Sequence, residues 1–198
     1  MVKFLNRESF CALVGMEVNT FKSLRQRGQV PAVWGDDPER EAARGFTDTA
    51  TFLMMLADEL YENLAISRER SAEIAARAFM VFTDRWQEVC DGSAALVDGK
   101  KPSAEILYGV VDMAGAEPIC VCGAFAQIAA EFVAPSNVVT VNITRLAAKL
   151  RRRASDLGID IEDFWHPERW PGRSSAEWKA KASTGLQTSP FCPKGRPA

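Results

Sequence analysis

A short run of polar and basic side chains between residues 18 and 27 holds the residue types that read DNA. Its sequence, VNTFKSLRQR, has three basic residues and no acidic one. Side-chain amides and hydroxyls can pair with base edges, and cations can contact phosphates. An ordinary solvated helix face has the same charge pattern. The spacing of the residues before and after the run must therefore decide between a DNA-binding helix and a solvated one. The candidate DNA-binding residues in this run are Asn19, Thr20, Lys22, Ser23, Arg25, Gln26 and Arg27.

The pattern of apolar residues predicts that this run is the second of two short helices. Residues 7–14 repeat apolar side chains at helical spacing, and Gly15 ends that helix. The second helix covers residues 18–27 and turns Phe21 and Leu24 inward. The polar and basic side chains therefore lie on its outer face.

These two helices and the residues after them resemble the winged helix-turn-helix of MerR-type regulators and the related excisionase-like domains of phages and prophages. The residues that carry the resemblance are Leu5 to Gly15, Val18 to Gly28, Val30-Pro31 and Arg44-Gly45-Phe46-Thr47, within about residues 3–80. The resemblance implies that the second helix enters the major groove of double-stranded DNA and that the wing touches the backbone. It also implies that Arg25 and Arg44 contact phosphates.

The chain departs from that family in two respects. Ser23-Leu24 replaces the paired tyrosines that are typical of metal and drug sensors. The family's long C-terminal dimerisation helix and metal-binding cysteines are not evident in the sequence. The resemblance therefore implies DNA binding but not the sensing of an effector.

The rest of the chain predicts an α+β protein with two parts and a tail. Helices are expected over 48–63 and 67–90, strands over 105–111, 118–122 and 137–142, and further helices over 124–133 and 143–157. The expected organisation is a winged helix-turn-helix domain over 1–90, a linker over 91–104, a small β-β-α-β-α unit over 105–165 and a flexible, largely irregular tail over 166–198. The small unit is expected to dimerise or to contact a partner protein.

The predicted helix over 143–157 is strongly basic. Arg145, Lys149 and Arg152 form one stripe, and Arg151 and Arg153 flank it. Three interpretations stay open for these cations. They can complement a helix dipole, form a second phosphate-binding surface, or contact the acidic region 49–142 of a partner subunit.

Composition and motifs exclude several classes of protein. The net charge is −2, so the chain is not a uniformly basic nucleic-acid coat. No long apolar run predicts a membrane span or a signal peptide, and the five cysteines are expected to be reduced in the cytoplasm. The spacing of Cys120 and Cys122 and the single His166 give no complete metal site. We find no motif for a cofactor and no catalytic constellation, so we expect no enzyme.

The function that the sequence favours is sequence-specific DNA binding by a transcriptional regulator of bacterial or phage type, acting as a homodimer. One alternative is a phage DNA-handling factor, either excisionase-like or an adaptor associated with packaging. Another is a protein-interaction module that keeps the helix-turn-helix shape without contacting DNA.

Overall fold

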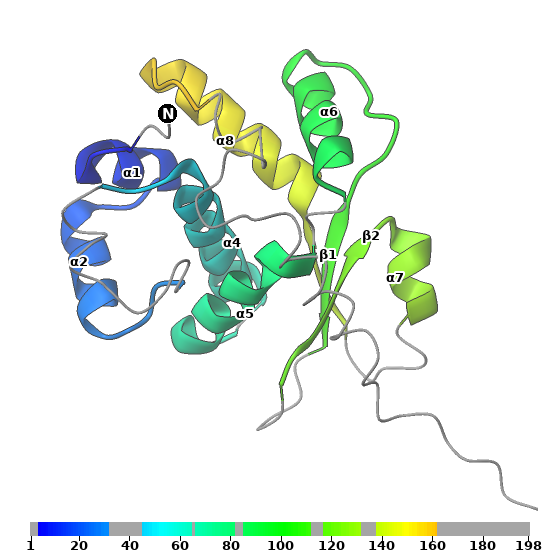
Figure 1. Ribbon diagram of the computed structural model, residues 1–198, viewed down its shortest axis with the longest axis horizontal. Coiled ribbons are helices and arrows are strands. Elements are labelled where there is room, and N and C mark those ends of the chain that lie inside the picture. The colour runs from blue at the N-terminus through cyan, green and yellow to red at the C-terminus, as the bar shows by residue number, and fades with distance from the viewer. Residues whose placement is uncertain are drawn as a thin grey trace, which may run out of the picture.

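The computed structural model describes residues 4–31, 45–64, 66–81, 85–111, 117–131 and 138–161. It confirms the predicted α+β class, with helices and a three-stranded antiparallel sheet (Figure 1). In chain order the elements are α1 (Arg7–Val14), α2 (Val18–Gln26), α4 (Asp48–Leu64), α5 (Arg68–Val81), α6 (Trp86–Val97), β1 (Leu107–Val111), β2 (Ile119–Gly123), α7 (Phe125–Glu131), β3 (Val139–Asn142) and α8 (Ile143–Leu157).

The sheet has the strand order β2-β1-β3, and its elements follow the predicted β-β-α-β-α sequence. Tyr108 in β1 lies opposite Cys122 and Val141, so these three side chains point to the same face of the sheet. The buried hydroxyl of Tyr108 donates a hydrogen bond of 3.1 Å to the Ile74 carbonyl. This bond joins the sheet to α5, while α7 lies on the other side (Figure 1).

The hydrophobic core runs through both predicted parts of the chain. Leu56 and Leu60 of α4 are fully buried in the same cluster as Leu146, Leu150 and Ala154 of α8. Helix α8 contacts α1, α4 and α6, and Figure 1 shows it lying across these elements. The apolar stripe of the basic helix is therefore buried against the N-terminal helices.

The predicted linker over 91–104 is wrong in its first part, because helix α6 occupies it. The sequence predicts a helix over 67–90 and a linker over 91–104, whereas the structure has two helices, and α6 continues to Val97. Gly92 is buried on α6, and a Cβ there would lie 2.7 Å from Cγ2 of Thr144. The small residue lets α6 and α8 approach closely, so it serves helix packing and does not mark a linker. The expected domain boundary after residue 90 falls inside α6.

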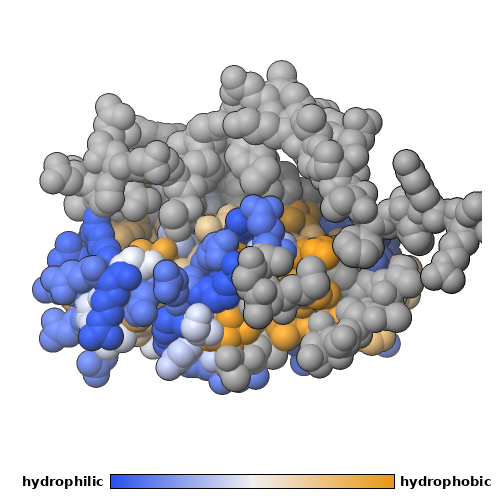
Figure 2. All heavy atoms as spheres, turned by 90° about the horizontal axis from the view of Figure 1, so that it is seen from below, coloured by the Kyte–Doolittle hydropathy of each residue, from blue (hydrophilic) through white to orange (hydrophobic). Residues whose placement is uncertain are grey.

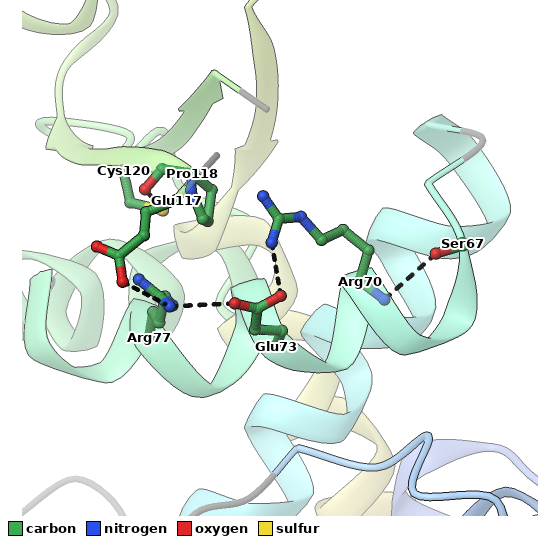
Figure 3. A network of polar contacts seen from close by, with 7 residues as sticks. All are labelled: Ser67, Arg70, Glu73, Arg77, Glu117, Pro118 and Cys120. Atoms are coloured by element: carbon green, nitrogen blue, oxygen red, sulfur yellow. Dashed lines mark hydrogen bonds and ion pairs between the residues drawn. The ribbon is translucent and has the colours of Figure 1, made fainter. Parts of the chain in front are cut away.

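A polar network ties α5 to the chain entering β2. The Arg77 guanidinium donates to Glu73 at 3.1 Å and to Glu117 at 3.3 Å (Figure 3). Arg70 donates to the other oxygen of Glu73 at 2.6 Å, and the two arginines hold the pKa of that carboxyl below its ordinary value. These side chains are partly solvated, so the network positions the segment more than it stabilises it.

Several sequence predictions fall on residues outside the described ranges. These are Arg44, the tail over 166–198, His166 and most of the expected wing. Within the described ranges, no helix combines the length and the apolar character that crossing a membrane requires.

Candidate nucleic-acid interface

Two helices joined by a short turn form the end of the molecule that carries the candidate residues. Helix α1 begins at Arg7, directly after the N-cap Asn6, whose side chain accepts a 2.7 Å hydrogen bond from the backbone N–H of Ser9. It ends at Gly15, which has a φ of +82° in the left-handed region. Helix α2 begins three residues later, at Val18.

Three aromatic rings fix α2 against α1 and the chain that follows. The ring of Phe10 lies 4.9 Å from Phe21 and 4.3 Å from Phe46, measured between centroids. Phe46 also forms a β-bridge with Leu5, with backbone hydrogen bonds of 2.7 and 2.9 Å. Phe21 and Leu24 are buried, as the sequence predicts, so the opposite face of α2 points to solvent.

The candidate residues of α2 lie on this outer face. Ser23 and Arg25 are half-buried at its edge, and the exposed candidates are Asn19, Thr20, Lys22, Gln26 and Arg27. Figure 2 shows that the end of the molecule carrying α2 is predominantly hydrophilic. The chain therefore presents amides, a hydroxyl and cations together on one short helix.

A hollow of about 450 Å³ lies between α1 and α2, and three basic side chains line it. Among the described residues, Arg7, Lys22 and Arg25 line it together with Phe21 and Gln26, and none of these is acidic. Such a hollow has the chemistry to accept an anion, because three cations line it together with an apolar ring and an amide. Sequence reasoning missed Arg7 as a site residue. Its one sequence signal is its place directly after the N-cap of α1.

The cations proposed for a second basic surface all have partners within the chain. Arg145 donates to the Glu105 carboxylate at 3.0 and 3.1 Å, which holds the pKa of that carboxyl below its ordinary value. Lys149 lies 4.0 Å from the carboxylate of Glu59. Arg152 donates to the Leu96 carbonyl at 2.7 Å.

Of the three interpretations of the basic helix, these contacts favour the one in which its cations complement a helix dipole, but the helix concerned is a different one. Leu96 lies in the last turn of α6, so Arg152 complements the end of a neighbouring helix and not the end of α8 itself. Arg145 and Lys149 keep 66% and 52% of their side chains exposed, so their charges still reach solvent. Each of these two cations therefore stays in contact with solvent but lies beside a carboxylate that balances its charge.

Of the cysteines in the described ranges, Cys11 and Cys90 are buried in the core, whereas Cys120 and Cys122 are partly buried and pack against it. Cys120 and Cys122 lie opposite Val110 and Tyr108, on the sheet face that packs against α5. Burial raises the pKa of Cys122 to about 12 and that of Cys90 to about 12, so both are protonated at neutral pH. Across the described part of the chain, no three His, Cys, Asp or Glu side chains gather closely enough to hold a metal ion.

Compared with protein-family models and with curated proteins, the chain matches none of them. The functional assignment therefore depends on the residues of α2 and on the hollow beside it.

Proposed function

We propose that this chain is a sequence-specific DNA-binding regulator of bacterial or phage type that inserts α2 into the major groove of double-stranded DNA. The observation that carries the proposal is the hollow that Arg7, Lys22 and Arg25 line. Beside it, the exposed amides of Asn19 and Gln26 have the chemistry that discriminates adenine. Phosphate contacts would fix the register of the helix, and the amides would read bases.

The bridge between Leu5 and Phe46 supports the winged version of this proposal. Phe46 belongs to the segment that resembles the end of a wing, and its two backbone hydrogen bonds hold it beside the strand-like residue before α1. The proposal includes a homodimer. One helix-turn-helix spans few base pairs. In a dimer, binding of the first helix-turn-helix raises the effective concentration of the second at its half-site, which increases the affinity.

Lys22→Ala is expected to reduce affinity for all duplex sequences by about the same factor. If Lys22 contacts a phosphate, the slope of log K against log[salt] should shrink by about one unit. Fluorescence anisotropy with labelled duplexes at several salt concentrations measures both quantities. The matched control is Lys100→Ala, which removes the same charge from a side chain that is 71% exposed and paired with Asp98.

Equal slopes for the two lysine variants would remove Lys22 from the phosphate contacts, and an unchanged slope in the double variant Lys22→Ala, Arg25→Ala would remove α2 from them. A wild-type chain without salt-dependent affinity for any duplex would contradict DNA binding altogether. The helix-turn-helix would then have to serve a protein partner.

Asn19→Ala is expected to relax specificity at one position of the binding site. A true base contact contributes roughly 1–3 kcal/mol of discrimination at its base pair. Selection from a randomised duplex library, followed by competition with single-base variants, measures the change. Asn63→Ala on α4 is the control, because Asn63 is exposed and its side chain donates a 2.8 Å hydrogen bond to Glu59 on the same helix. A uniform loss over all sequences would give Asn19 a positioning role.

A further inference from the structure

The last carbonyls of α1 accept hydrogen bonds from a residue that lies 140 positions further along the chain than Leu13. The last carbonyls of an α-helix have no partner within the helix, so each needs another donor. The backbone N–H of Gly15 donates to Cys11 at 2.8 Å and to Ala12 at 3.2 Å, which satisfies the first two. The carbonyls of Leu13 and Val14 need donors from elsewhere.

Arg153 of α8 supplies those donors. Its Nη1 atom donates to the Leu13 carbonyl at 2.9 Å and also to the carbonyl of Val14. A guanidinium is a charged donor at the negative end of the helix, so both the hydrogen bonds and the dipole favour this place. The guanidinium also covers Gly15, because a Cβ there would lie 2.7 Å from Nη1 and Nη2.

Helix α8 is itself fixed at its other end. Its first backbone N–H, at Ile143, donates to the Ile106 carbonyl at 2.9 Å, beside the start of β1. The side chain of Asn142 caps the helix by accepting a 2.9 Å hydrogen bond from the N–H of Arg145. One helix therefore connects the sheet rigidly to the turn between α1 and α2.

We propose that Arg153 is a positioning residue for DNA binding. By holding the last carbonyls of α1 and covering Gly15, it sets the direction in which the chain enters α2. The affinity of α2 for DNA then depends on α8, and through α8 on the C-terminal sheet. This inference rests on the proposed function, since it concerns how the same helix is presented to the duplex.

The test compares Arg153→Gln with Arg152→Gln in the full chain. Both variants lose one charge from α8, and both remove a guanidinium that caps a neighbouring helix, because Arg152 caps α6 at Leu96. Only Arg153 reaches the turn before α2. Affinity for a selected duplex, the salt slope, and amide hydrogen exchange of residues 16–26 are measured where both variants are fully folded.

We expect Arg153→Gln to weaken DNA binding about tenfold, since two charge-assisted hydrogen bonds are lost, with an unchanged salt slope. Amides of α2 should exchange faster, and Arg153→Lys should restore part of the affinity because it can still donate to one carbonyl. Arg152→Gln should bind within about twofold of wild type, in the range of distant surface changes.

Equal affinities for the two glutamine variants would overturn the role of Arg153 while leaving DNA binding by α2 intact. A salt slope that falls by a full unit in Arg153→Gln would also overturn it, because Arg153 would then be a direct phosphate contact. A wild-type chain without salt-dependent affinity would overturn the proposed function and this inference with it.

Discussion

Replacing Leu150 by alanine is expected to lower the free energy of unfolding of the whole chain by about 2–5 kcal/mol. Leu150 is fully buried in the cluster that α8 shares with the N-terminal helices. Removing most of its side chain leaves a cavity whose lining loses contacts on every side. Because the core is continuous, amides in α1 and in β1 should lose protection together, in one cooperative transition.

Leu157→Ala is the matched control for this prediction. It makes the same chemical change on the same helix, but Leu157 is 49% exposed. We expect a loss within about 0.5 kcal/mol, as for other surface substitutions. Urea denaturation followed by circular dichroism gives the energies, and hydrogen exchange gives the protection of each element. Two separate transitions, with only the C-terminal amides affected by Leu150→Ala, would restore the two-domain organisation that the sequence predicts.

Gly15→Ala is expected to destabilise the chain by roughly 2–4 kcal/mol. A side chain at a φ of +82° costs about 1–2 kcal/mol through the clash of its Cβ with the backbone. The new methyl group also displaces the Arg153 guanidinium, which leaves two helix carbonyls without their charged donor. Losing hydrogen bonds to a charged group adds about 1.5–3 kcal/mol, less what solvent restores around a half-buried side chain.

Gly158→Ala separates these two contributions. Gly158 also ends a helix, with a φ of +63°, but a Cβ there meets no atom within 4 Å. It should show only the backbone cost, so the two alanine variants should differ by about 1 kcal/mol or more. The difference should shrink when both are made in an Arg153→Ala background, because the guanidinium is then absent. Equal losses in the wild-type background would show that Arg153 moves aside without cost.

Capping residues next to a helix made the first and last residues of two helices predictable from the sequence. The sequence predicts helices over 7–14 and 143–157, and α1 and α8 have these bounds. Each helix begins after an asparagine whose side chain caps it, and each ends at a glycine in the left-handed region. Caps of this kind depend on residues three or four apart, so the sequence alone contains them.

Contacts between distant residues account for what the sequence could not predict. The sequence predicts Gly92 to lie in a linker, because nothing near it in the chain shows that Thr144 lies against it. The sequence leaves three interpretations open for the cations of α8, and none of them includes the carbonyls, 56 and 140 residues away, that Arg152 and Arg153 contact. Arg7 enters the candidate site only through the way in which α1 lies against α2. In each case tertiary contact decides the role, and periodicity cannot report it.

The contact between Arg153 and α1 can form only late in the synthesis of the chain. The end of α1 leaves the ribosome early, but its last two carbonyls wait for a donor that is 140 residues further along the chain. At about 5–20 residues per second, that interval is roughly 7–28 s. The helix pair made first therefore lacks this contact until α8 has been made. A nascent chain that stalls before α8 emerges would carry α2 without the contact from Arg153 to the end of α1.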